Sequence, residues 1–380
     1  MKILFLDQSG KPGGAELCLI DIAKPYRDNS LVGLFADGDF KDLLKKNQIP
    51  VEILTTQSIQ VRKESSFFKA LSSSQQILPL IFKVAKIARG YDIIYANTQK
   101  ALVVGAIASA LTGRRLVYHL HDILSPEHFS STNRRIAVTL ANRFASLVIA
   151  NSQASKNAFI NAGGSEKITS VIYNGFNPKI YQQDESIAVE VRRELELESK
   201  FIIGNFSRLS PWKGQHILLA ALAQCPSEVT VIFVGDALFG EQEYVTQLHQ
   251  QVKELGLKDR VKFLGFRSDI PKLMAACDLV THTSTAAEPF GRVIVEAMLS
   301  GKTVIATKAG GAIELVEDGI DGFLVTPGDP QQLAEVINKC YQQVSETIKI
   351  GQHAKNIVSQ RFDVDKINEE IRQLLVKVRN

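Results

Sequence analysis

The sequence has few cysteines, and their spacing fits neither a disulfide framework nor a zinc site. The 380 residues include only Cys18, Cys225, Cys277 and Cys340, which are far apart and form no C-x-x-C pair. Zinc sites and disulfide frameworks show closely repeated cysteine spacings. We therefore expect four buried thiols in a reducing, cytoplasmic compartment and no structural metal.

Long apolar runs and blocks of like charge are also missing. The longest apolar stretch, residues 101–111, is far short of the roughly 20 residues that span a bilayer. The first residues, MKILFLDQSG, carry too short an apolar run for a signal peptide and predict a strand instead. The net charge is only +4, without a lysine or arginine run typical of nucleic-acid tails. The sequence thus predicts no membrane span and no nucleic-acid partner.

What the chain does contain is typical of a two-domain globular protein. Apolar residues make up 45% and charged residues 22%, as in ordinary soluble domains. A length of 380 residues favours two domains. The turn-rich stretch from Tyr173 to Pro178 places the boundary near residue 180.

Short apolar, β-rich runs alternate with helical stretches in both halves. This alternation predicts an α/β protein whose parallel sheets carry helices on both faces. We expect strands over residues 3–7, 31–36, 51–54, 93–96, 116–120, 147–150, 201–206, 229–235, 261–266, 278–280 and 303–306.

Three short motifs could suggest other nucleotide or metal sites, and each fails on its context. The loop with Gly10, Gly13 and Gly14 lacks the G-x-G-x-x-G spacing of a nicotinamide site, although a plain strand-to-helix turn stays open. Asp37-Gly38-Asp39 resembles a metal-binding D-x-D but is typical of a turn. Gly301-Lys302-Thr303 precedes a strand, whereas a P-loop follows one.

The most informative stretch runs from Thr281 to Thr303 and holds Glu288 and Glu296, separated by seven residues. Pro289 suits a first helical position, so we expect a helix to start there. Backbone N–H groups at such a start would suit phosphate or sugar oxygens. The two carboxylates would lie roughly 12 Å apart along the helix and could hold both ends of an elongated ligand. A helix cap and a solvated glutamate are the alternative.

This stretch resembles the E-x7-E signature of retaining glycosyltransferases, specifically glycosyltransferase family 4, and its EPFG form makes the resemblance specific. Residues 207–214, SRLSPWKG, are similar to the family's G-R-L-x-x-x-K-G phosphate motif, with Ser207 in place of glycine. His121-Asp122 resembles the family's HD pair. Residues 310–325 resemble its last loop, helix and strand, so the resemblance covers nearly the whole chain.

The resemblance implies the GT-B fold, in which two Rossmann-like doubly wound domains face an interdomain cleft. Residues 1–180 would be the acceptor-side domain and residues 181–361 the nucleotide-sugar domain, with helix 362–380 crossing back onto the first. The implied reaction moves a sugar from a nucleotide-diphosphate donor to an acceptor hydroxyl with retention. UDP is the default nucleotide of the donor, and GDP is the alternative. The implied enzyme needs neither a cofactor nor a metal.

The family also implies roles for individual residues. Arg208 and Lys213 would neutralise the leaving diphosphate, Glu288 would hold the donor sugar and His121 would line its face. Glu296 would hold the ribose. The full donor-binding set that the resemblance implies is Gly13, Gly14, Arg208, Lys213, Gly265, Phe266, Glu288, Pro289, Phe290, Gly291, Arg292, Val293 and Glu296.

Two other functions stay open at this level, a non-catalytic scaffold at a membrane surface and a nucleotide-sugar epimerase. Residues 57–90 combine aromatic and basic side chains. Such a segment could lie on an anionic membrane as a peripheral contact, or it could pack against the core. The acceptor could be a sugar, a lipid-linked sugar or a small molecule.

Overall fold

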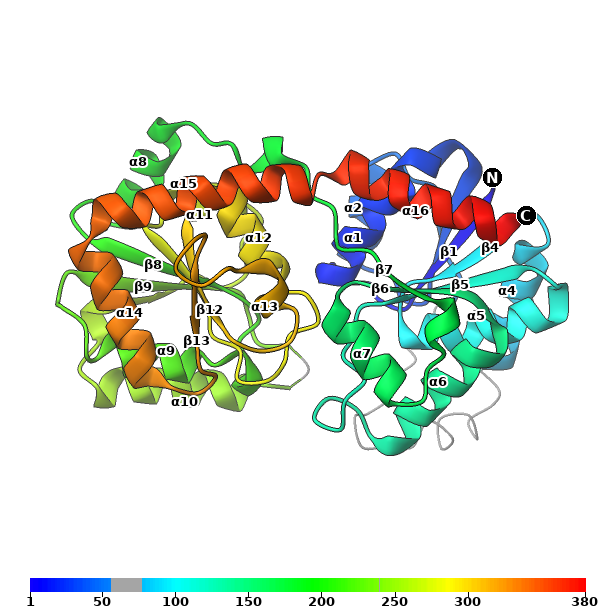
Figure 1. Ribbon diagram of the computed structural model, residues 1–380, viewed down its shortest axis with the longest axis horizontal. Coiled ribbons are helices and arrows are strands. Elements are labelled where there is room, and N and C mark those ends of the chain that lie inside the picture. The colour runs from blue at the N-terminus through cyan, green and yellow to red at the C-terminus, as the bar shows by residue number, and fades with distance from the viewer. Residues whose placement is uncertain (56–76, 239) are drawn as a thin grey trace. The chain divides into compact units, whose positions relative to one another are not determined.

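The computed structural model describes residues 1–55, 77–238 and 240–380, which form two compact units (Figure 1). Unit 1 comprises Met1–Gly175 together with Val364–Asn380, and unit 2 comprises Phe176–Asp363. Each unit contains one sheet whose paired strands all run parallel. The predicted α/β class with two Rossmann-like, doubly wound sheets is therefore confirmed.

The sheet of unit 1 has the strand order β3-β2-β1-β4-β5-β6-β7. The order reverses between β1 and β4, and ligands of doubly wound folds bind beyond the carboxyl ends of the strands at this point. The strands are β1 Ile3–Asp7, β2 Ser30–Leu34, β3 Val51–Ile53, β4 Ile93–Ala96, β5 Arg115–Leu120, β6 Ala145–Ala150 and β7 Thr169–Val171.

The helices of unit 1 cover both faces of this sheet. Alternate side chains of a strand point to opposite faces, and Leu4 and Leu6 enter one core cluster while Ile3 and Phe5 enter the other. The C-terminal helix adds Ile367 and other apolar residues to the second cluster. The helices are α1 Gly14–Ala23, α2 Asp39–Lys46, α4 Ile77–Ala88, α5 Gln99–Thr112, α6 Ser131–Phe144, α7 Gln153–Asn161 and α16 Val364–Arg379.

The sheet of unit 2 has the order β10-β9-β8-β11-β12-β13, so its reversal point lies between β8 and β11. The strands are β8 Phe201–Phe206, β9 Val229–Val234, β10 Val261–Phe263, β11 Leu279–His282, β12 Thr303–Thr307 and β13 Phe323–Val325. The helices are α8 Glu185–Glu194, α9 Gln215–Leu222, α10 Gln242–Glu254, α11 Ile270–Ala276, α12 Arg292–Leu299, α13 Ala312–Leu315, α14 Pro330–Gln342 and α15 Val344–Arg361.

The segment predicted to touch a membrane is described only in part, because residues 57–76 lie outside the described ranges. In the described part, Ile77, Leu80 and Ile81 of α4 are buried in the core of unit 1, while Phe82 is exposed. Lys83 pairs with Glu52 at 2.9 Å. The apolar face of α4 therefore serves the core of its own unit.

Two further predictions can be compared with the structure. All four cysteines are free and buried, as predicted. Asp37 accepts a hydrogen bond from the N–H of Gly38 and pairs with Lys41, so this D-x-D is a turn at the start of α2, as predicted. Among the residues that the structure covers, no helix combines the length and apolar character needed to cross a bilayer.

Candidate functional site

The predicted residues of unit 2 lie on two loops that follow β8 and β11, at the reversal point of its sheet. Backbone and side-chain hydrogen bonds tie these loops together. The Thr283 hydroxyl donates to the carbonyl oxygen of Lys213 at 3.0 Å, and the N–H of Thr285 donates to that of Trp212 at 2.8 Å. These bonds place Lys213 beside the loop that carries Glu288.

Gly214 makes this close approach of the loops possible. Its φ of +73° lies in the left-handed region, which side chains other than glycine rarely adopt. A Cβ at this position would collide with the carbonyl oxygen of Thr283. The glycine that ends SRLSPWKG is therefore required by the backbone.

Lys213 and Glu288 meet at the centre of this site. Lys213 Nζ donates to both carboxylate oxygens of Glu288 at 2.7 Å and lies 4.0 Å from the centroid of the Trp212 ring. Ser284 Oγ donates to Glu288 Oε2 at 2.9 Å, and His282 Nε2 lies 3.2 Å from the same oxygen. The structure thus brings together two predicted residues, Lys213 and Glu288, with two that were not predicted.

The surroundings of Glu288 keep it ionised. Burial alone would raise the pKa of its carboxyl group, but the charge of Lys213 and the hydrogen bond from His282 outweigh burial and hold the pKa well below its usual value. Glu288 therefore offers only hydrogen-bond acceptors, which suit the hydroxyl groups of a sugar.

The predicted helix start near Pro289 is wrong, because α12 begins at Arg292. Glu288 is held in an extended bridge with Gly310, and its carbonyl oxygen accepts from the N–H of Gly311 at 2.7 Å. Gly291, with φ +90°, then turns the chain into the helix as its N-cap. Glu288 therefore lies before the helix, and the distance along one helix axis does not describe its separation from Glu296.

Glu296 and its neighbours occupy the first turns of α12. Arg292 Nε lies 3.4 Å from Glu296 Oε1, and its guanidinium lies 4.4 Å from the centroid of the Phe176 ring. Phe290 is buried and stacks on Phe176 with centroids 6.2 Å apart. Both glutamates of the signature therefore have a cation beside them, and Pro289, Phe290, Gly291 and Val293 form the turn and helix start between them.

Arg208 lies on the loop after β8 and points toward α10. Its Nε is 3.3 Å from Oε2 of Glu241, whose Oε1 accepts from Ser210 Oγ at 2.6 Å. The loop is also held from inside, because Gln215 Nε2 donates to Ser207 Oγ at 2.8 Å and to the carbonyl oxygen of Arg208 at 2.9 Å. Ser207 thus supports the loop at the position where the family has glycine.

Gly265 and Phe266 follow β10 at the same end of the sheet. The carbonyl oxygen of Gly265 accepts from the N–H of Gly235 at 2.8 Å, and Gly265 has φ +63°. The Phe266 side chain is 70% exposed, so its ring presents an open apolar face.

In unit 1, polar side chains gather where β1, β4 and β5 end. Asn97 Nδ2 donates to Asp7 Oδ2 at 2.7 Å and to the carbonyl oxygen of Ala15 at 3.1 Å. His121 Nε2 lies 2.9 Å from Asn97 Oδ1. Because the carbonyl of Ala15 can only accept, the Asn97 amide is oriented with Oδ1 toward His121, whose Nε2 therefore carries a proton.

Gly13 and Gly14 open α1 beside this cluster. The N–H of Gly13 donates to Glu16 Oε2 at 2.9 Å, and Glu16 and Asp7 are both buried. Burial raises the pKa of Asp7 to about 6, and burial together with the charge of Asp7 raises that of Glu16 to about 8. Glu16 is therefore a carboxylic acid, rather than a carboxylate, at neutral pH.

This shift predicts a pH-dependent stability that Glu16→Gln removes. Between the usual pKa of 4.5 and the folded value of about 8, the unfolded chain loses the proton of Glu16 while the folded chain keeps it. The stability that Glu16 contributes therefore falls as pH rises through this interval. We therefore expect Glu16→Gln to raise the melting temperature above that of the parent, and we expect this increase to be larger near pH 8 than near pH 4.5. The control is Glu370→Gln, which removes a carboxylate from the exposed side of α16. An equal increase in melting temperature for Glu16→Gln at both pH values would contradict the raised pKa of Glu16.

Side chains that could ligate a metal also occur in unit 1. Cys18, His119 and His121 form one such group, with their ligand atoms within 4.8 Å of one another. His119 Nδ1 already pairs with the hydroxyl of Tyr95 at 2.8 Å, and His121 Nε2 pairs with Asn97. One nitrogen of each ring therefore serves a hydrogen bond within the unit, whereas His119 Nε2 is buried without a partner among the described residues. We assign no metal to this group.

Sequence reasoning missed five residues of these two clusters, namely Asp7, Glu16, Asn97, His282 and Ser284. One signal was available for two of them, since Asp7 and His282 are polar residues that end buried strands. The carboxyl ends of parallel strands are where ligand-binding residues of such folds lie.

Comparison with known proteins identifies a family for both parts of the chain. The model for "Glycosyl transferases group 1" matches residues 188–357, and the model for "Glycosyltransferase Family 4" matches residues 12–180.

Individual relatives agree with these matches. The chain is 64% identical to Anabaena Alr3699/HepE, crystallised in complex with UDP and glucose, over 99% of this chain and 100% of that one, with a TM-score of 0.93. It is 27% identical over 300 residues to N-acetyl-alpha-D-glucosaminyl L-malate synthase of Bacillus anthracis, 76% of either protein. It is 32% identical over 227 residues to spore coat protein SA of Bacillus subtilis strain 168, 56% of this chain and 59% of that protein.

Proposed function

Because this chain belongs to glycosyltransferase family 4, we propose that it is a retaining glucosyltransferase that moves glucose from UDP-glucose to an acceptor hydroxyl without a metal ion. The observation that carries the proposal is the contact between Lys213 and Glu288, which joins the two family motifs in one site. The donor is proposed from the Anabaena relative, which was also crystallised with UDP-glucose.

Arg208 and Lys213 are proposed to stabilise the departing diphosphate. Cleavage of the bond to the sugar leaves extra negative charge on the diphosphate, and preorganised positive groups lower the barrier to this step. Arginine can bind two oxygens at once, while lysine acts as a compact charge. Backbone N–H groups at the start of α12, from Phe290 to Val293, would add to this field. Together these groups would supply the charge that a metal supplies in other transferases.

The carboxylates are proposed to position the donor. Glu288 would accept hydrogen bonds from the hydroxyl groups of glucose, and Glu296 from those of the ribose, because ionised carboxylates only accept. Lys213 would then contact both the diphosphate and Glu288. The exposed ring of Phe266, beside Gly265, would face the uracil base.

Unit 1 is proposed to serve the acceptor side and unit 2 the nucleotide sugar. Gly13 and Gly14 would let the donor sugar approach the backbone of α1, and His121, held by Asn97, would line its face. We assign no enzyme nucleophile. The acceptor hydroxyl would attack from the leaving-group side and pass its proton to the donor phosphate, which retains the anomeric configuration.

The proposal predicts selective, metal-independent binding of the donor. In calorimetry with EDTA present, we expect UDP and UDP-glucose to bind and GDP and ADP to bind at least about tenfold more weakly, a difference of about 1.4 kcal/mol. Added magnesium should change the affinity for UDP little. Binding of UDP only with magnesium would contradict metal independence, and tighter binding of GDP would replace the proposed donor.

Assays of the same purified protein with UDP-glucose distinguish the proposed transferase from the two alternative functions. An epimerase would convert UDP-glucose into an epimer without any acceptor, which chromatography of the nucleotide sugars would detect. A non-catalytic scaffold would bind no donor. A transferase instead yields UDP and a glycoside whose anomeric configuration NMR can assign. Contact with an anionic membrane stays a prediction, and cosedimentation with phosphatidylglycerol vesicles would test it.

A further inference from the structure

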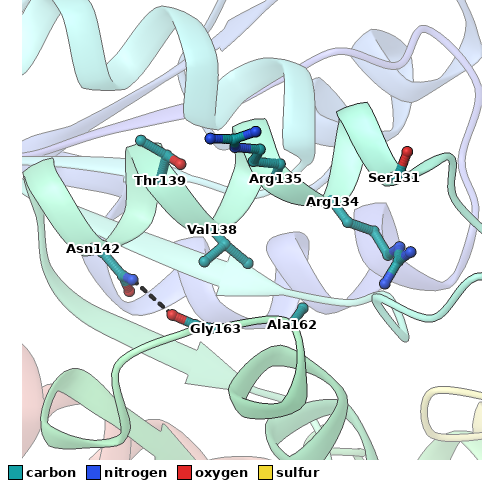
Figure 2. Close-up of a pocket in the computed structure, with 8 residues that line it drawn as sticks. All are labelled: Ser131, Arg134, Arg135, Val138, Thr139, Asn142, Ala162 and Gly163. Atoms are coloured by element: carbon teal, nitrogen blue, oxygen red, sulfur yellow. Dashed lines mark hydrogen bonds between the residues drawn. The ribbon is translucent and has the colours of Figure 1, made fainter.

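A groove of about 450 Å³ lies on α6 in unit 1, but its charged side chains do not converge. Arg134 and Arg135 point in opposite directions from α6, as Figure 2 shows. A ligand site needs a few polar groups that point at a common position. Such convergence occurs in unit 2, where His282 and Ser284 both contact one oxygen of Glu288.

The segment that follows β11 contacts both partners of the central ion pair. Successive side chains of an extended segment point to opposite sides. The hydroxyl of Thr283 donates to the carbonyl oxygen of Lys213 at 3.0 Å. Its neighbours on either side, His282 and Ser284, contact Glu288 instead. One short segment therefore holds the loop of the lysine and the carboxylate of the glutamate at the same time.

The two carboxylate oxygens of Glu288 are unequally occupied. Oε2 accepts from Lys213 Nζ at 2.7 Å and from Ser284 Oγ at 2.9 Å, and it lies 3.2 Å from His282 Nε2. Among the described residues, Oε1 has only the contact to Lys213 Nζ at 2.7 Å. A carboxylate oxygen offers about two lone-pair positions. Oε2 is therefore saturated, whereas Oε1 can accept one more hydrogen bond.

The ring of His282 is placed for this contact rather than for packing. It is buried, and Nε2 carries the hydrogen because an ionised carboxylate can only accept. Nδ1 is buried without a partner among the residues that the structure describes. A buried polar atom without a partner opposes folding, so an apolar ring would suit this position better. What the imidazole supplies here is the hydrogen bond to Glu288.

Ser284 links its two neighbours. Its Oγ lies 3.3 Å from His282 Nε2 and 2.9 Å from Glu288 Oε2, so the three groups form a closed triangle. The hydroxyl of Thr307, the last residue of β12, donates to the carbonyl oxygen of Ser284 at 2.8 Å. Because β11 and β12 are paired strands, the fold itself holds the triangle in place.

We propose that His282 and Ser284 are positioning residues, which hold Glu288 through Oε2 and thereby direct Oε1 to a hydroxyl group of the donor sugar. The inference rests on the proposed function, because that function assigns Glu288 to the sugar. Neither residue needs to touch the donor. Their loss should affect recognition of the sugar and not of the nucleotide, since the contacts to phosphate and base do not depend on Oε1.

The test compares the affinities of UDP-glucose and UDP, measured by calorimetry on the same variant. We expect Ser284→Ala and His282→Leu each to weaken binding of UDP-glucose by about tenfold, and binding of UDP by less than about twofold, because Glu288 loses a donor that fixes its orientation. His282→Gln should recover most of the affinity, since an amide N–H can replace Nε2–H. Ser109→Ala, which removes a buried serine hydroxyl from α5, is the control and should change neither affinity.

Each other outcome of this comparison has a distinct meaning. A parallel loss of UDP affinity would show a general structural role and overturn the proposal, as would unchanged affinity for both ligands. If another nucleoside diphosphate binds in place of UDP, the proposed donor fails, and the same ratio measured with that nucleotide and its glucose conjugate still tests His282 and Ser284. Binding of no nucleotide sugar by the parent would overturn both proposals.

The transfer rate provides a second readout. In the parent, His282→Leu should lower kcat/KM by about tenfold, whereas in Glu288→Ala it should have almost no further effect, because residues that act through one another are not additive. Equal losses in both backgrounds would show that His282 acts independently of Glu288 and would overturn the proposal. Ser284→Ala, which removes a single oxygen atom, takes the place of His282→Leu if that variant does not fold.

Discussion

Lys213→Ala and Glu288→Ala are each expected to reduce the transfer rate by about a hundredfold to a thousandfold, the range seen when one preorganised charge partner is removed. The first change removes the cation that is proposed to contact the leaving diphosphate. The second removes the proposed acceptor for the sugar hydroxyls and the partner that holds Lys213 Nζ at 2.7 Å. Steady-state kinetics with UDP-glucose measure both effects.

These two changes should also affect stability, because the ion pair is largely buried. The Lys213 and Glu288 side chains are only 15% and 13% exposed. Removal of one partner from a buried pair costs about 3–5 kcal/mol, since the other charge is left uncompensated. Glu288→Ala should cost less, because the flexible Lys213 side chain can reach solvent. The double variant should recover stability relative to Lys213→Ala but should not recover transfer.

A double-mutant cycle in urea, with kcat measured on the same proteins, separates the two roles. The control is the exposed pair Lys349 and Glu346 of α15, whose side chains are 74% and 60% exposed and whose removal should change stability by less than about 1 kcal/mol. If the double Lys213/Glu288 variant regained transfer, the pair would be structural only. Additive stability losses would show that the two side chains do not depend on each other.

The meeting of Lys213 and Glu288 could be predicted because the two family motifs that contain them are local in sequence. Lys213 and Glu288 belong to short motifs with fixed spacing, and the apolar runs around them predicted the strands that hold them. Their contact also follows from topology, because β8 and β11 are neighbours in a parallel sheet and the loops after neighbouring strands emerge at one edge.

The start of α12 could not be predicted from local preference alone. Pro289 favours a first helical position, but the bridge between Glu288 and Gly310 keeps the chain extended up to the turn at Gly291. That bridge joins residues far apart in the sequence, so a local pattern contains no trace of it. A second boundary of this kind separates α14 from α15, where Gln343 leaves helical geometry between the two helices.

The hydrogen-bond networks of buried polar side chains could not be predicted from the sequence either. Asn97 has no motif around it, and its importance appears only when its hydrogen-bond partners are known. His282 ends a buried strand, which makes it a candidate but does not reveal which residue it contacts. His282 acquires a role from Glu288 at 3.2 Å, and Asn97 from Asp7 and His121. Such roles depend on tertiary contacts between loops, which spacing along the chain does not encode.

Arg208→Ala is expected to reduce kcat by about a hundredfold to a thousandfold, with a small effect on folding. The side chain pairs with Glu241 at 3.3 Å, and the two are 25% and 20% exposed. A partly exposed pair of this kind contributes only about 0.2–1 kcal/mol to stability, so the melting temperature should change little. The loss should therefore lie in the chemical step, where the leaving diphosphate gains charge.

Arg208→Lys distinguishes charge from geometry at the same position. Lysine keeps the positive charge but cannot bind two phosphate oxygens in the fixed fork of a guanidinium, so we expect it to recover only part of the lost rate. Arg208→Ala combined with Lys213→Ala should cost less than the product of the two single effects, because both cations act on one leaving group. Full activity of Arg208→Lys would show that only charge is needed. Full activity of Arg208→Ala would remove this residue from the diphosphate site and leave Lys213 and the start of α12 to stabilise the leaving group.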